Sequence, residues 1–86
     1  MRSDFKMFDA VRVSRLHVPV RAVHGTRSPA RQPRVGDRGT IVEVFGPAGE
    51  ATYLVECVEP DGGTAWVAEL AREELEAITP ADPVER

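Results

Sequence analysis

The sequence has little of what several protein classes need. Cys57 is the one cysteine in 86 residues, which excludes an internal disulfide and a cysteine-rich zinc site. No apolar run approaches the roughly 20 residues that span a bilayer. The first residues, MRSDFKMFDAVRV, carry scattered charges and lack the apolar stretch of a signal peptide. We therefore expect a cytoplasmic protein that is neither exported by a signal peptide nor membrane-spanning.

Residues that carry catalysis or bind metal are also sparse. The soft or imidazole ligands are His17, His24 and Cys57, and the two histidines are seven residues apart across a proline, a spacing that no regular element turns into a chelate. The stretch GDRG at residues 36–39 precedes a predicted strand, whereas a phosphate-binding loop opens a helix. We expect its glycines to shape a turn and a barrel corner. The sequence thus predicts no cofactor, no metal and no catalytic residue.

Charge is divided unevenly along the chain. Residues 1–38 hold nine Arg or Lys against three Asp, a balance of +6, and residues 39–86 hold two Arg against eleven Asp or Glu, a balance of −9. Such blocks of charge usually mark interaction surfaces. The alternative is that the basic segment lies across an acidic barrel and neutralises it within one molecule.

Four segments have the alternation and the β-branched or aromatic content of strands, and Gly, Pro or Asp bounds each of them. They are residues 8–13, 39–45, 51–58 and 64–70. The side chains expected to face the core are Phe8 and Ala10 in the first, where the valines can share the burial and Asp9 and Arg12 face outward; Thr40, Val42 and Val44 in the second; Tyr53, Val55 and Cys57 in the third; and Trp66, Ala68 and Leu70 in the fourth. In the second strand, Ile41, Glu43 and Phe45 are expected on the less buried face.

The connections predict how these strands join. Residues 46–50 (GPAGE) and 59–63 (EPDGG) supply the Gly and Pro of two tight hairpin turns. After the fourth strand, AREELEAI favours one helical turn that exposes Arg72, Glu73 and Glu74 and returns Leu75 and Ile78 to the sheet. We therefore predict an all-β, small SH3-like barrel of about five strands, a single domain over residues 1–78. Its long basic loop covers residues 14–36, and residues 79–86 are a flexible tail.

Two stretches carry a family resemblance. GDRGTIVEV followed by YLVECVEPDGGTAWVAELAREELEAI resembles the SH3-like barrels, in particular a family of short bacterial proteins of uncharacterised role in which an FDVV-like strand precedes a Gly-bounded strand. Membership implies a stand-alone binding module, encoded beside a toxin-like or enzyme partner. No catalytic residues carry over from this family.

A second resemblance lies inside the long loop. HGTRSPARQPRVGDRGTI is similar to a segment of nitrile hydratase β-subunits and their accessory proteins. The matching positions are His24, Thr26, Arg27, Pro29, Gly36 and Gly39. The spacing from Pro29 to Gly36 is longer than in that pattern, and the aromatic residue before the glycine is missing. This resemblance implies an accessory or β-type subunit that lends loop arginines to a partner's active site.

The function indicated by these features is a non-catalytic binding module that docks on a protein partner or on further copies of itself. The residues expected to carry the contact are Arg27, Arg31, Arg34, Arg38 and Phe45. Ile41, Leu54 and Val58 join Phe45 as an apolar set on the outward face, with Ile41 the member most readily covered by the barrel itself. The alternative is nucleic acid, as in KOW-like barrels, because six arginines of residues 14–38 are available to phosphates. The acidic second half and the inward assignment of Trp66 and Tyr53 argue against it.

Overall fold

The computed structural model describes residues 5–25 and 31–78, and these residues form five strands and one 3-10 turn. The strands are β1 (Ala10–Val13), β2 (Arg38–Phe45), β3 (Thr52–Val58), β4 (Thr64–Ala71) and β5 (Leu75–Ala77), and the turn η1 (Arg72–Glu74) lies between β4 and β5. All neighbouring strands are antiparallel in one sheet with the order β4-β3-β2-β1-β5. The prediction of a small all-β fold of about five strands is confirmed. The sheet is barrel-like but not closed.

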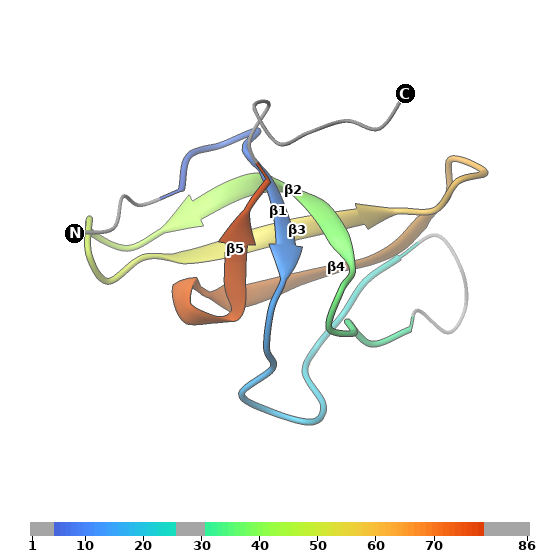
Figure 1. Ribbon diagram of the computed structural model, residues 1–86, viewed down its shortest axis with the longest axis horizontal. Helices are drawn as coiled ribbons and strands as arrows, with labels where there is room; N and C mark the ends of the chain where they lie inside the picture. Colours follow the sequence, from blue (N-terminus) through green and yellow to red (C-terminus); the bar gives the residue numbers. More distant parts are fainter. Residues whose placement is uncertain (1–4, 26–30, 79–86) are drawn as a thin grey trace.

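Strand β2 connects the two halves of this sheet. Its first residues, Arg38 to Thr40, pair with β1, and the stretch from Thr40 to Phe45 pairs with β3. In Figure 1, β1 and β5 lie in front of β3 and β4 and run across them. The sheet therefore folds over on itself, and the core lies between its two halves.

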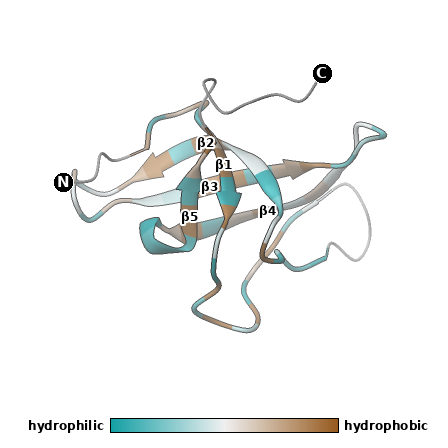
Figure 2. Cartoon of the chain, viewed as in Figure 1, coloured by the Kyte–Doolittle hydropathy of each residue, from teal (hydrophilic) through white to brown (hydrophobic). Residues whose placement is uncertain are grey.

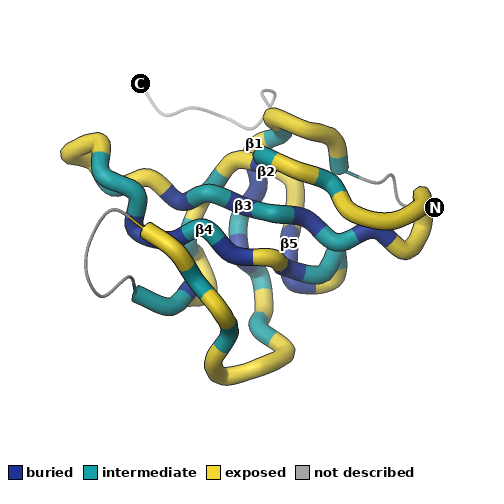
Figure 3. The backbone as a smooth tube through the Cα atoms, turned by 180° about the vertical axis from the view of Figure 1, so that it is seen from behind, coloured by how far each residue is buried: buried dark blue, intermediate teal, exposed yellow. Residues whose placement is uncertain are grey.

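The core is filled from alternate positions of the strands, as a period of two requires. Along β3 and β4, buried positions alternate with less buried ones (Figure 3), and apolar residues recur along the strands in Figure 2. The predicted inward faces of residues 51–58 and 64–70 are confirmed. The largest fully buried side chains are Trp66, Tyr53, Ile41, Leu70, Val11, Val13 and Val55.

In the first strand the predicted burial of Phe8 and Ala10 is wrong, whereas the burial allowed for the valines is confirmed. Val11 and Val13 are the buried residues of β1, whereas Ala10 is exposed and Phe8 is 75% exposed. Phe8 has a positive φ of 74° and donates its N–H to the carbonyl of Ile41 at 2.7 Å. The turn over residues 6–9 thus places Phe8 outside the sheet, one step out of phase with the valines.

The predicted faces of the second strand are also wrong in its first half. Ile41 is fully buried and Thr40 is exposed, while Val44 packs against the core as expected. The cause is a bulge, because the register with β3 shifts between Ile41 and Glu43. An extra residue at a bulge reverses the phase of burial along the strand. Ile41 therefore belongs to the core and not to the outward apolar set.

The predicted turns are present, in contrast to the predicted buried faces of the first two strands. Two hairpins join β2 to β3 and β3 to β4, with Gly46 and Gly62 at positive φ. The helical turn after β4 is present as η1, and Leu75 is buried behind it. Glu74 was expected to be exposed and is only 2% exposed.

Cys57 lies in the core, 6% exposed, as expected. Burial, followed by the nearby charge of Asp37, raises the pKa of its thiol. We expect a thiol reagent to react with Cys57 only as the protein unfolds, so that labelling follows the unfolding curve in urea. Cys57→Ser is expected to lower the free energy of unfolding by about 1–3 kcal/mol, since it replaces a buried thiol of the core with a hydroxyl, which costs more to remove from water. Rapid stoichiometric labelling of the folded protein would contradict this placement.

Candidate functional site

The long basic loop returns along the barrel as two arms. The first arm is residues 14–25 and the second is residues 31–37, with residues 26–30 outside the described part. The first arm touches the free edge of β4 at one point, where His24 and Val67 exchange two backbone hydrogen bonds of 3.0 and 2.6 Å. At the start of this arm, the backbone N–H groups of Ser14 and Arg15 donate to the carbonyl of Glu74, at 2.8 and 3.4 Å. Side chains hold the stretch between these two points.

Gln32 ties the two arms to each other. Its Oε1 accepts the Arg21 N–H at 2.9 Å, and its Nε2 donates to the Arg21 carbonyl at 2.8 Å. The side-chain amide therefore satisfies both backbone groups of one residue on the opposite arm. This pairing fixes the spacing between the arms where ladder hydrogen bonds are absent.

Glu74 anchors the first arm to the barrel. Its carboxylate accepts both guanidinium nitrogens of Arg21, at 3.0 and 2.5 Å, and the backbone N–H groups of His17 and Ala71, at 2.7 and 2.9 Å. Burial alone would raise the pKa of Glu74, but these hydrogen bonds, with that of Arg21 the strongest, lower it to about 2. Glu74 is thus ionised, and both of its carboxylate oxygens accept hydrogen bonds at the base of the first arm. A forked arginine pair of this kind is geometrically specific.

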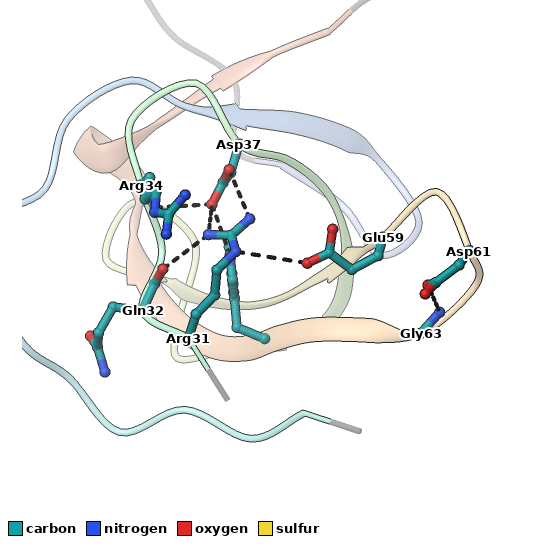
Figure 4. A network of polar contacts seen from close by, with 8 residues as sticks. Arg31, Gln32, Arg34, Asp37, Glu59, Asp61 and Gly63 are labelled. Carbon is teal, nitrogen blue, oxygen red and sulfur yellow. Dashed lines mark hydrogen bonds and ion pairs between the residues drawn. The ribbon is translucent and has the colours of Figure 1, made fainter. Parts of the chain in front are cut away.

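Asp37, the last residue of the second arm, braces this arm internally through Arg31 (Figure 4) and links it to the barrel through Trp66. It accepts two hydrogen bonds from Arg31, at 2.8 and 3.2 Å, one from the indole N–H of Trp66 at 2.9 Å, and one from the backbone N–H of Arg34 at 2.9 Å. Against the effect of burial, these donors lower the pKa of Asp37, and Asp37 in turn raises the pKa of Arg31. On its other side Arg31 faces Glu59 at 3.8 Å.

The five residues expected to contact a partner therefore differ in their surroundings. Arg31 is engaged with Asp37, and Arg27 lies outside the described residues. Arg34 and Arg38 are exposed, and within residues 5–25 and 31–78 neither guanidinium has a hydrogen bond or an ion pair. Phe45 is 42% exposed at the end of β2.

An open groove of about 390 Å³ lies between the first arm and the ends of β3 and β4. Its lining is mixed, with apolar side chains beside the Arg21 and Glu74 pair: His17, Val18, Arg21, Ala22, Thr52, Glu69, Leu70, Ala71 and Glu74. Phe45 is the cross-strand neighbour of Thr52, so it flanks the groove on the β2 side. The exposed side chains of Val18 and Val20 extend the apolar surface along the arm.

The anchoring residues were the part of this site that sequence reasoning missed. Glu74, Asp37 and Gln32 are polar residues in turns or loops, where polar residues are ordinarily solvated. One signal was present, because an acidic residue three positions after the end of a strand can accept the N–H that begins a helical turn. Glu74 does so with Ala71.

Candidate metal ligands are dispersed in the described part of the chain. Residues 5–25 and 31–78 contain no group of three or more His, Cys, Asp or Glu that could hold a metal ion. The same residues include no helix long and apolar enough to cross a membrane.

Comparison with family models, with curated proteins and with solved structures finds no match to this chain. The class of protein is therefore defined by the fold alone. It is a small, barrel-like, all-β protein whose long basic loop is fixed to the barrel by two buried or half-buried carboxylates.

Proposed function

We propose that this chain is a non-catalytic binding module that docks on a protein partner through the exposed arginines of its basic loop. Phe45, which flanks the groove on the β2 side, supplies an apolar contact. The observation that carries the proposal is the anchoring of the loop by Glu74 and Asp37. A loop that is already held in place loses little conformational freedom when it binds. The anchored second arm thus presents Arg34, and the start of β2 presents Arg38, on a preformed surface.

Arginine and aromatic side chains suit such a contact. The guanidinium group makes forked hydrogen bonds to carboxylates, and its stem lies on apolar surface. Phe45 and the valines of the first arm supply apolar area beside the groove. A protein surface that carries carboxylates around an apolar patch would complement this arrangement.

Nucleic acid and another enzyme's active site are the alternatives that the sequence left open. The large aromatics Tyr53 and Trp66 are buried, so they are not available to stack on bases. The capture experiment below separates these alternatives, because nuclease treatment removes a nucleic-acid partner and leaves a protein partner in place.

We expect Arg34→Ala combined with Arg38→Ala to reduce capture of partners at least about tenfold without changing the melting temperature, because neither guanidinium supports the fold. Phe45→Ser is expected to weaken capture in the same way. Arg31→Ala is the matched control, and it should lower the melting temperature because it leaves Asp37 without its forked partner. The measurement is capture by the immobilised protein from nuclease-treated lysate, at low and at high salt, beside thermal unfolding. Capture that survives the double variant, or that resists salt, would disprove the proposal.

A further inference from the structure

The outer face of the sheet is acidic where β2, β3 and β4 lie side by side. Leu54 on β3 is directly opposite Glu43 on β2 and Glu69 on β4. Both glutamates are exposed and Leu54 is half-buried between them. In the next row Glu56 lies opposite Val67, so each apolar side chain has a carboxylate beside it. We refer to Glu43, Leu54, Glu56, Glu69 and Val67 as the acidic face.

This face has no basic side chain of its own to neutralise it. Residues 39–71 contain no Lys or Arg and six carboxylates. Glu56 and Glu69 accept hydrogen bonds from Thr64 and Thr52, which leaves their charge in place. Glu43 has no hydrogen bond or ion pair within the described ranges.

Among the residues that the structure describes, the arginines of the basic loop do not neutralise this face either. Its two engaged arginines, Arg21 and Arg31, bind Glu74 and Asp37. In the described part of the loop, neutralisation of the barrel by the loop therefore accounts for those two carboxylates and not for the acidic face. Arg34 and Arg38 are exposed on the same molecule, and neither guanidinium forms an ion pair with a described residue.

The geometry of β2 separates Arg38 from Glu43 within one chain, although Glu56, which is opposite Thr40, lies only two positions along the ladder from Arg38. Arg38 begins the strand, beside Arg12 of β1, and Glu43 lies near its end, beside Leu54 of β3. At about 3.4 Å per residue, five positions along a strand separate the two by roughly 17 Å. That distance is more than twice the reach of an arginine side chain, so Arg38 and Glu43 can meet only between two molecules.

We propose that the acidic face is the docking surface for the exposed arginines of a second copy of this chain, Arg34 and Arg38. This rests on the proposed function and names the partner that the arginines engage. The two surfaces are different patches of the molecule, so the contact is head to tail. Carboxylates placed around Leu54 receive the guanidinium groups, and the apolar centre receives their stems.

Sedimentation velocity of the purified chain over a range of concentrations tests self-association directly. At low ionic strength we expect the sedimentation coefficient to rise with concentration. At 1 M salt, where the screening length falls to about 3 Å, we expect the chain to sediment as a monomer. A wild-type chain that remains a monomer at all concentrations at low salt would overturn the inference.

Charge reversal identifies the surfaces. One variant carries Glu43→Arg and Glu69→Arg, and the other carries Arg34→Glu and Arg38→Glu. Each alone should weaken self-association at least about tenfold, because one of the two surfaces now repels its counterpart. An equimolar mixture of the two should associate again, since each retains the surface that the other has lost. Failure of the mixture to associate would refute the pairing.

Two controls show whether a variant loses the contact or loses its fold. Two further outcomes distinguish failure of the self-association from failure of the proposed function. Thermal unfolding of each variant at high salt should be cooperative, and Glu73→Arg, an exposed reversal on η1 outside the acidic face, should leave association unchanged. If the wild type is monomeric but loses capture of another protein with Arg34→Ala and Arg38→Ala, the inference fails and the proposed function stands. If neither capture nor self-association responds to those arginines, both fail.

Discussion

Glu74→Ala is expected to lower the free energy of unfolding by about 3–5 kcal/mol, the usual cost of removing one partner of a buried ion pair. The change leaves the Arg21 guanidinium facing the Glu69 carbonyl with no carboxylate, and it removes the acceptor for the His17 and Ala71 N–H groups. For a domain of this size, each 1 kcal/mol corresponds to about 4–8 °C in melting temperature. Thermal unfolding should therefore show a fall of more than about 12 °C.

The neighbouring exposed residue gives the control for this result. Glu73→Ala removes the same charge from the same turn, and we expect a change within about 0.5 kcal/mol. Equal effects of the two substitutions would show that Glu74 does not anchor the first arm.

We expect Glu74 to determine part of the loss of stability in acid, measured as the free energy of unfolding. Its ordinary pKa of 4.5 falls to about 2 in the folded protein, so the unfolded state binds the proton more readily. The stabilisation is fully present above pH 4.5 and is lost as the pH falls towards 2. The difference between these two pKa values corresponds to about 3 kcal/mol in the free energy of unfolding. Urea unfolding of wild type and Glu74→Gln between these pH values should show a shallower pH dependence in the variant.

Gly39→Ala is expected to lower the free energy of unfolding by about 3 kcal/mol, the upper part of the usual range for overpacking. A Cβ at Gly39 would lie 2.7 Å from the carbonyl oxygen of Glu56 and 2.7 Å from Cγ1 of Val55. The oxygen belongs to the β3 backbone, so relief requires the two strands to separate at the point where β2 leaves β1 for β3. Chemical denaturation is the measurement.

Gly36 provides the comparison for Gly39. Gly36 lies two residues before β2, and a Cβ there meets nothing within 4 Å, although its φ of 98° is strained for an alanine. Gly36→Ala should therefore cost only about 1–2 kcal/mol, the penalty of the left-handed conformation. A larger loss at Gly36 than at Gly39 would show that the close approach of β2 and β3 is not the limiting contact.

The sequence alone determined the elements whose pattern is local. In β3 the inward set of Tyr53, Val55 and Cys57 follows from simple alternation, and the turns at Gly46 and Gly62 follow from residues that tolerate positive φ. In both cases the information lies within a few residues of the chain. The all-β class and the two hairpins could therefore be predicted without any long-range contact.

Only the tertiary structure decided which polar residues anchor the loop. Glu74 is buried because the N–H of His17, 57 positions away in the chain, and the guanidinium of Arg21, 53 positions away, converge on it. The bulge at Ile41 likewise depends on how β2 fits against β3, and it reversed the predicted faces. A charged side chain is buried only where several donors meet it, and strands distant in sequence bring those donors together. Sequence patterning therefore supplied the arginines, while folding determined that Arg21 and Arg31 hold the loop and that Arg34 and Arg38 remain exposed.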